Sequence, residues 1–232
     1  MTQFVDQLCK QIEQAARSNT LLRPVGGGTK NFYGGPLKGD EVHMQAWAGI
    51  LEYEPTELVS TAKAGTPLST IEAALAEHNQ ELAFEPPRFG AQSTLGGAIA
   101  SGLAGPARLS RGGVKDYVLG CTLIDGRAQV LHFGGVVMKN VAGYDVSRVL
   151  PGSMGTLGIV LDLSIKVMPK SVAEATLQFE FNANQAIDQT NTWLGQALPI
   201  SASHYQNGTL TLRLRGARAA VESATNSMGG MR

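Results

Sequence analysis

The chain has 232 residues, 43% of them hydrophobic, which is enough for one large domain or for a domain with a smaller appendage. Its 19 Lys and Arg residues balance its 19 Asp and Glu residues and are scattered, so we expect neither nucleic acid nor an anionic membrane surface as a partner. No apolar run reaches the roughly 18 residues of a membrane-spanning helix, and the N-terminus lacks a signal-peptide pattern. The two cysteines match no disulfide framework, so we expect a cytoplasmic protein.

The hydrophobic pattern of the first half predicts a mixture of helices and strands. Apolar residues recur at helical spacing over residues 2–18, with Thr2 as a candidate N-cap, and an apolar run at 21–25 predicts a strand that ends in three glycines. Further strands are expected at 41–45, 49–53 and 58–64, followed by a helix over 66–78 with Thr66 as its N-cap. The stretch 86–113 is rich in Gly, Pro and Ser and predicts only one short helix, at 95–101.

The second half predicts a hairpin, a long strand and a second α+β unit. The hairpin spans 117–124 and 128–133 and turns at Asp125-Gly126, and the long strand spans 159–167. After it we expect a strand at 175–181, a helix at 183–198 with Asn182 as N-cap, strands at 200–205 and 209–214, and a helix at 217–228. The order β-α-β-β-α is most of a ferredoxin-like unit, which needs one more strand to complete its sheet. The predicted domains are 1–170, divided at about residue 85, and a partial cap at 171–232.

The first candidate binding motif is the glycine run at 26–28, followed by Thr29 and Lys30. Glycine lets backbone N–H groups turn inward and approach an anion without an intervening Cβ. The Walker spacing is absent, and Asn31 stands where the Rossmann fingerprint needs its third glycine. The motif therefore indicates either a diphosphate-binding loop of another kind or a glycine-rich turn without a ligand.

The second motif joins the hydroxyls of Ser93 and Thr94 to the small residues of the short helix expected at 95–101. A helix that begins near Thr94 would direct its N–H groups and its dipole at an anion. The alternative is that Gly96 and Gly97 only allow the helix to pack tightly. The motif alone leaves both interpretations open.

The third motif reads Lys-Asn-Val-Ala-Gly-Tyr-Asp at 139–145 and Gly-Ser-Met-Gly-Thr-Leu-Gly-Ile at 152–159. In this order and spacing, the three motifs resemble the FAD-binding domain shared by vanillyl-alcohol oxidase and p-cresol methylhydroxylase. The third motif, together with residues 85–87, 102–106 and 133–140, closely resembles the FAD-binding subunits of bacterial glycolate oxidases. The resemblance covers nearly the whole chain.

This resemblance implies an α+β fold, in which a two-subdomain p-cresol methylhydroxylase-type FAD-binding domain is followed by an incomplete ferredoxin-like cap. It implies noncovalent FAD, because the first loop has no histidine and the second no cysteine of the kind that tethers the flavin in some relatives. The implied cofactor-binding residues are Val25, Gly26, Gly27, Gly28, Thr29, Lys30, Ser93, Thr94, Gly96, Gly97, Ser101, Gly102, Asn140, Tyr144, Gly155, Gly158, Ile159 and Val160. Arg88 and Arg108 are candidates for binding a substrate carboxylate, or else they are solvated arginines that brace loops.

The implied function is oxidation of a 2-hydroxy acid, glycolate first, with hydride transfer from the α-carbon to flavin N5. The electrons would pass to partners, a homologous FAD-linked subunit and an iron–sulfur subunit, and any association with the inner membrane would be peripheral and through them. Relatives place their base and metal ligands in a segment beyond the length of this chain, so no catalytic base and no metal ligand is predicted here. The alternatives are an accessory flavin subunit that relays electrons, a structural subunit without cofactor, and an enol-ether reductase, which the third motif disfavours.

Overall fold

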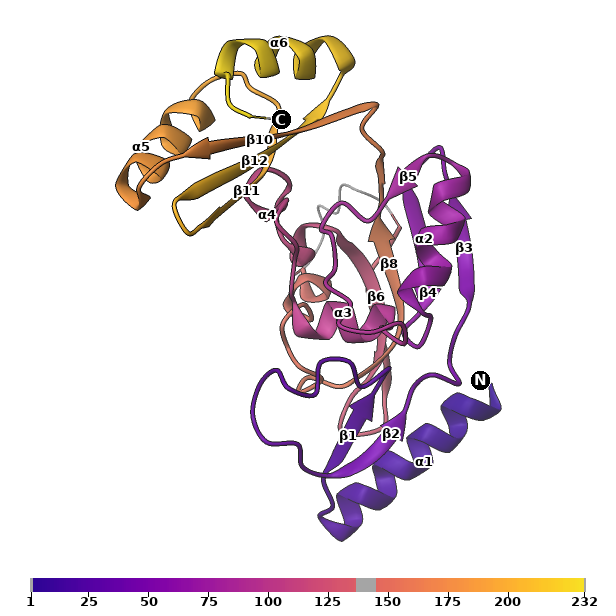
Figure 1. Ribbon diagram of the computed structural model, residues 1–232. Helices are drawn as coiled ribbons and strands as arrows, with labels where there is room; N and C mark the ends of the chain where they lie inside the picture. Colours follow the sequence, from indigo (N-terminus) through magenta and orange to yellow (C-terminus); the bar gives the residue numbers. More distant parts are fainter. Residues whose placement is uncertain (1, 137–144, 232) are drawn as a thin grey trace. The chain divides into compact units, whose positions relative to one another are not determined.

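The computed structural model describes residues 2–136 and 145–231 (Figure 1). The candidates Asn140 and Tyr144 lie outside the described residues. The chain forms two compact units, and the first comprises Met1–Leu82, Pro86–Leu103 and Gly113–Met168. The second comprises Ala83–Glu85, Ala104–Gly112 and Pro169–Arg232. Both units contain helices and strands, which confirms the predicted α+β class.

A five-stranded antiparallel sheet with the order β3-β4-β8-β6-β7 forms the centre of the first unit. The strands are β3 (Ile50–Glu54), β4 (Val59–Lys63), β6 (Val118–Ile124), β7 (Val130–Gly134) and β8 (Ile159–Lys166). The long predicted strand is β8, whose Leu161, Leu163 and Ile165 are buried. The predicted hairpin is β6–β7, and Asp125 fixes its turn by accepting hydrogen bonds of 2.9 Å from the N–H groups of Arg127 and Gln129.

Two helices of the first unit lie where the sequence predicts helices. They are α2 (Leu68–Glu77) and α3 (Leu95–Ser101), and α3 packs on β4 and β8. An ideal Cβ on Gly96 would lie 2.8 Å from the Cβ of Ala64, so glycine allows this close packing. The predicted Thr66 cap of α2 is wrong, because the Thr66 hydroxyl bonds to Gly49 and to the Lys63 carbonyl instead.

A two-stranded parallel sheet carries the glycine loop of the first motif. Strand β1 (Leu22–Val25) pairs with β2 (Asp40–His43), so the residues between them leave one strand and return to its neighbour. Helix α1 (Gln3–Ser18) packs beside these strands (Figure 1) and buries Val5, Leu8 and Ile12 in a shared core. The side chain of Thr2 makes no capping hydrogen bond, contrary to expectation.

Several short elements fall where the sequence predicts none. They are β5 (Gln80–Glu81), α4 (Arg108–Arg111), β9 (Met168–Pro169) and the 3-10 turns η1 (Val114–Asp116) and η2 (Val146–Val149). Elements of two to four residues are too short to show a helical or strand period in the sequence. No helix among the described residues is long and apolar enough to cross a membrane.

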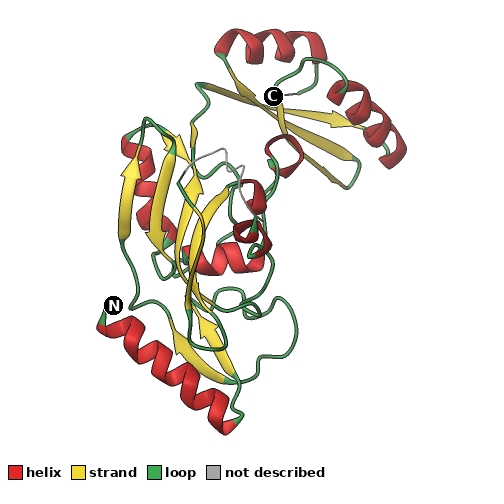
Figure 2. Ribbon diagram, turned by 180° about the vertical axis from the view of Figure 1, so that it is seen from behind, coloured by secondary structure: helices red, strands yellow, loops and turns green. Residues whose placement is uncertain are grey.

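The second unit contains an antiparallel sheet of order β10-β12-β11 with two helices against it (Figure 2). The strands are β10 (Ala173–Glu180), β11 (Ile200–Gln206) and β12 (Thr209–Gly216), and the helices are α5 (Ala183–Leu194) and α6 (Arg218–Met228). The β-α-β-β-α order is as predicted. Asn182 caps α5 in a capping box with Gln185, but α5 ends at Leu194 rather than at 198. Met231 forms an isolated antiparallel bridge with Gln178 on the outer edge of β10, with N···O distances of 2.8 and 3.0 Å.

Two segments from the middle of the chain, Ala83–Glu85 and Ala104–Gly112, belong to this second unit. Glu85, in the first segment, accepts hydrogen bonds from Arg213 on β12 and from the Ala107 N–H in the other segment. Ser110 donates to the Ser201 carbonyl of β11 at 3.0 Å. The second unit comprises these two segments, residues 83–85 and 104–112, and the chain from Pro169 onward.

Candidate functional site

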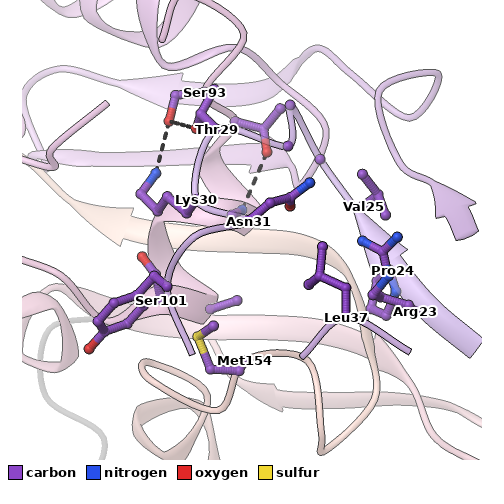
Figure 3. Close-up of a pocket in the computed structure, with 17 residues that line it drawn as sticks. Arg23, Pro24, Val25, Thr29, Lys30, Asn31, Leu37, Ser93, Ser101 and Met154 are labelled. Atoms are coloured by element: carbon purple, nitrogen blue, oxygen red, sulfur yellow. Dashed lines mark hydrogen bonds between the residues drawn. The ribbon is translucent and has the colours of Figure 1, made fainter. Parts of the chain in front are cut away.

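The first and second motifs line one cavity of about 150 Å³ in the first unit (Figure 3). One wall is the loop after β1, and the other is the start of α3 with the two residues before it. The predicted cofactor residues in this cavity are Val25, Gly26, Gly27, Gly28, Thr29, Lys30, Ser93, Thr94, Gly97 and Ser101. The structure thus brings together residues that lie some seventy positions apart in the sequence.

A second cavity, of about 70 Å³, shares part of this wall and is reached by the third motif. It is lined by Gly26, Thr94 and Gly97 of the first cavity, and it adds the predicted residues Gly96, Gly155, Gly158, Ile159 and Val160. Gly102 is the one described cofactor candidate that lines neither cavity. It ends α3 at φ +64, where an ideal Cβ would lie 2.8 Å from the backbone N of Gly152.

The glycine loop combines free donors with a position on the cavity wall. Within residues 2–136 and 145–231, the backbone N–H groups of residues 26–30 donate no hydrogen bond. All five residues line the first cavity. A run of unbonded backbone N–H groups around a concavity is an anion-binding arrangement.

The loop has to be glycine because it lies directly on the second motif. An ideal Cβ on Gly27 would lie 1.7 Å from the Gln92 carbonyl oxygen, and one on Gly26 would lie 2.3 Å from the Thr94 hydroxyl. Real Cβ atoms do not approach other atoms this closely, so any other residue would push the two walls apart. The close packing of backbone on backbone fixes the width of the cavity.

Ser93 connects the two walls by its hydroxyl group. Lys30 Nζ donates to Ser93 Oγ at 3.0 Å, and Thr29 Oγ1 lies 3.4 Å from the same oxygen (Figure 3). Ser93 is 1% exposed, and burial lowers the pKa of the Lys30 ammonium from 10.5. An anion in the cavity would favour the charged ammonium and counteract that effect.

The N-terminus of α3 does not offer the free donors that the second motif suggests. Leu95 N–H donates to the Thr66 carbonyl at 2.9 Å, and Gly96 N–H donates to the Ala64 carbonyl at 2.7 Å. The next donor, Gly97 N–H, bonds to the Thr94 hydroxyl at 3.3 Å. The expectation that these N–H groups bind the anion is therefore wrong, and the steric alternative for Gly96 describes the structure.

Several lining residues were not predicted from the sequence, and among them Arg23 and Met154 have the clearest chemical roles. Arg23 pairs with Glu41, and its buried Nε has no hydrogen-bond partner among the described residues. Met154 lies between glycines of the third motif and lines both cavities (Figure 3). The motif could have indicated Met154, whereas Arg23 lies in an ordinary strand and carries no sequence signal.

The two arginines proposed for a substrate carboxylate lie on different units. Arg88 is 48% exposed, forms an ion pair with Glu72, and does not line either cavity. Arg108 is the first residue of α4 in the second unit. The contact with Glu72 agrees with the loop-bracing alternative for Arg88, and a substrate role for either arginine remains a prediction.

A family model and the sequences of curated relatives both match this chain. The model of the family described as "FAD binding domain" matches residues 3–134. Glycolate oxidase subunit GlcE of Escherichia coli (strain K12) is 44% identical over 227 residues, which are 98% of this chain and 65% of that protein. Glycolate oxidase subunit GlcD of Bacillus subtilis (strain 168) is 32% identical over 192 residues, which are 80% of this chain and 40% of that protein. The chain thus spans less than two thirds of the length of either relative.

A solved structure shows the same fold at low sequence identity. An alkyldihydroxyacetonephosphate synthase superposes with a TM-score of 0.74 at 19% identity, over 96% of this chain and 47% of that one. At this identity the similarity concerns the fold alone.

Proposed function

Because the chain belongs to the FAD binding domain family, we propose that its two cavities hold FAD noncovalently, with the diphosphate on the loop of residues 26–30. The observation that carries this proposal is the set of unbonded N–H groups on that loop. Five donors with no partner among the described residues fit a group that has many acceptor oxygens and two negative charges. A glycine turn without a ligand would leave these donors on the cavity wall without an acceptor.

The side chains around the loop complement the same anion. Lys30 adds a positive charge, and Thr29 and Ser93 add hydroxyl groups within hydrogen-bonding distance of one another. Charge-assisted hydrogen bonds are about twice as strong as neutral ones, so Lys30 is the main electrostatic contribution. We assign Ser93 the role of positioning the Lys30 ammonium.

We assign the second cavity to a ring system of the cofactor, because part of its wall is apolar. Its wall combines the glycines of the third motif with Met44, Ala64 and Ile159, which offer apolar surface. In the described part of the chain, no histidine or cysteine lines either cavity, so no side chain there could tether a flavin. This supports noncovalent binding.

We further propose that the chain is the FAD-binding subunit of a glycolate oxidase-type complex that oxidises a small 2-hydroxy acid. The proposal rests on the similarity to the GlcE and GlcD subunits, and the homologous FAD-linked subunit and an iron–sulfur subunit are the proposed partners. When bound, FAD would supply the redox chemistry, as the acceptor of a hydride from the substrate. The residues described here contribute binding and orientation of the cofactor.

FAD binding by the purified chain tests the first part of this proposal. We expect added FAD to bind with quenched flavin fluorescence, and Gly27→Ala to abolish retention because its Cβ would overlap the Gln92 carbonyl. Gly35→Ala is the matched control, since an ideal Cβ on Gly35 meets nothing within 4 Å. A wild-type chain that binds no FAD, or equal retention by the two variants, would refute the diphosphate loop.

A second function, an accessory subunit whose FAD only relays electrons, is favoured by one observation. Among the described residues, no carboxylate or imidazole lines either cavity, so neither cavity contains an obvious base for a hydroxyl proton. Anaerobic addition of glycolate distinguishes the two functions. Bleaching of the flavin in the isolated chain supports substrate oxidation, whereas bleaching that requires the partner subunits supports the relay.

A further inference from the structure

Two exposed phenylalanines form a pair beside the first cavity. The ring centroids of Phe32 and Phe89 are 5.0 Å apart with an interplanar angle of 78°, which is the edge-to-face geometry that aromatic pairs prefer. Phe32 is 67% exposed and Phe89 is 58% exposed. The pair thus forms a contact that the hydrophobic core does not impose.

The pair joins the same two loops that form the cavity walls. Phe32 follows the diphosphate loop by two residues, and Phe89 precedes Ser93 by four residues. Phe89 has φ +53, which is uncommon for a residue with a side chain and persists only where its surroundings fix it. Next to it, an ideal Cβ on Gly90 would lie 2.8 Å from Cγ2 of Thr29, so the two loops are also in close contact there.

Besides the close packing at Gly26, Gly27 and Gly90, side chains connect the loops in two places. Around Ser93, the hydroxyl receives Lys30 and approaches Thr29 at the cavity wall. At the exposed phenylalanines, the contact is purely aromatic. Tyr33 N–H bonds back to the Lys30 carbonyl at 2.9 Å, so residues 30–33 form one turn, and this turn connects Phe32 to the end of the diphosphate loop.

We propose that Phe32 and Phe89 act as an aromatic clasp, which holds the diphosphate loop closed on the second motif and slows the release of FAD. This inference rests on the proposed FAD function, and it gives the two residues a positioning role without contact with the cofactor. A preformed loop binds more tightly than one that must be ordered on binding. Aromatic pairs contribute enough for a change of about two- to tenfold in an equilibrium constant.

A double-mutant cycle on the whole chain tests the clasp. The variants are Phe32→Ala, Phe89→Ala and the double variant, and the measurement is the rate of FAD release after dilution, followed by the recovery of flavin fluorescence. We expect each single variant to release FAD about two- to tenfold faster, and the double variant to be no faster than the faster single one. Phe89→Tyr, which keeps the ring, should release FAD at the wild-type rate.

Leu51→Ala provides the matched control, because Leu51 is 52% exposed on β3 and lies outside both motifs. It should release FAD as the wild type does. The thermal midpoint of each apoprotein shows whether a variant still folds, and Phe32→Leu with Phe89→Leu replaces the alanines if they do not. The two leucines keep apolar volume but lose the edge-to-face contact of the rings, so we still expect FAD to be released faster than from the wild type.

The outcomes separate the clasp from the function on which it rests. If the wild type binds no FAD, the proposed function fails. If the wild type binds FAD and the variants release it at the wild-type rate, or the two single effects add, the clasp is refuted while FAD binding stands. Unchanged release combined with lost binding of a partner subunit would also overturn the clasp, and would make the phenylalanines a docking surface.

Discussion

Glu85 accepts a hydrogen bond of 2.6 Å from Nη2 of Arg213, which lies 128 residues further along the chain. The same carboxylate accepts from the Ala107 N–H at 3.0 Å, and Nη1 of Arg215 lies 3.6 Å from it. Both Glu85 and Arg213 have side chains that are 22% exposed, so the pair is largely removed from water. One side chain thus joins two inserted segments to strand β12 of the second unit.

Glu85→Gln should therefore loosen the second unit. The amide keeps the shape of the side chain but loses the charge that two arginines face, and hydrogen bonds to charged groups contribute about 1.5–3 kcal/mol. We expect faster amide hydrogen exchange across β12, equivalent to about 1–3 kcal/mol. Glu180→Gln, at an exposed position on β10, is the control. Equal exchange in the two variants would show that the contact contributes no stability.

Lys30 should make FAD binding depend on pH. Burial lowers the pKa of this lysine from 10.5, and only the protonated form carries the charge that attracts a diphosphate. We expect FAD affinity to fall as the pH rises through the lowered pKa, and Lys30→Met to bind about tenfold or more weakly with no such dependence. Titrations of FAD between about pH 7 and pH 10 measure both effects. A variant with the wild-type pH profile would contradict the assignment.

The lowered pKa of Lys30 also predicts that the stability of the apoprotein rises with pH, whereas FAD affinity falls. The unfolded chain has the ordinary lysine pKa and the folded chain a lower one, so the unfolded state binds more protons between the two values. Linkage then makes the free energy of unfolding rise with pH in that window. Urea unfolding of the apoprotein at a series of pH values checks the sign, and Lys30→Met should reduce the slope.

Cys121 should be unreactive until the first unit unfolds. It lies in β6 at 6% exposure, and burial raises the pKa of its thiol to about 11, so almost no thiolate is present at neutral pH. In a Cys9→Ser background, we expect no reaction with a thiol reagent at about pH 8 in buffer and complete reaction in urea. Rapid labelling of Cys121 in the native protein would mean that this strand opens readily.

Two of the three predicted helix caps, Asn182 and Thr2, should differ in their effect on stability. Asn182 accepts a hydrogen bond from Gln185 N–H at 3.0 Å, so Asn182→Ala should destabilise the second unit by about 1 kcal/mol. Thr2 occupies the N-cap of α1 without a capping hydrogen bond, so Thr2→Ala should have almost no effect. Thermal unfolding followed by circular dichroism compares the two, and a larger loss for Thr2→Ala would reverse the assignment.

Local sequence signals predicted the parts of the fold that depend on neighbouring residues. The bounds of α3 and the turn at Asp125 follow from small residues, periodicity and turn chemistry within a few positions. The occupied donors of α3 could not be predicted, because their acceptors, the carbonyls of Ala64 and Thr66, come from a distant segment. The same applies to Glu85, whose partner Arg213 is adjacent only after folding.

For the candidate site, the glycine motifs predicted residues that line the two cavities, and tertiary contacts decided which of their polar groups are already hydrogen-bonded. The first motif indicated either an anion loop at residues 26–30 or a glycine turn without a ligand, and the N–H groups of this loop have no partner among the described residues. Arg23 and Leu37 were missed because a single side chain on a cavity wall leaves no pattern in the sequence. Arg88 illustrates the opposite situation. Its sequence made it a candidate for binding a substrate carboxylate, but in the structure its guanidinium already forms an ion pair with Glu72.

The bridge between Met231 and Gln178 lies on the outer edge of β10, where no other strand of the described sheet pairs. Gln178 already uses its outward N–H and C=O groups, and by strand alternation those of Thr176 and Glu174 point to the same side of β10. An extended chain that continued from Met231 along β10 would cover them. Where nothing does, this row of backbone groups is a template for intermolecular pairing, so the outer edge of β10 is a site where a second chain could add a strand.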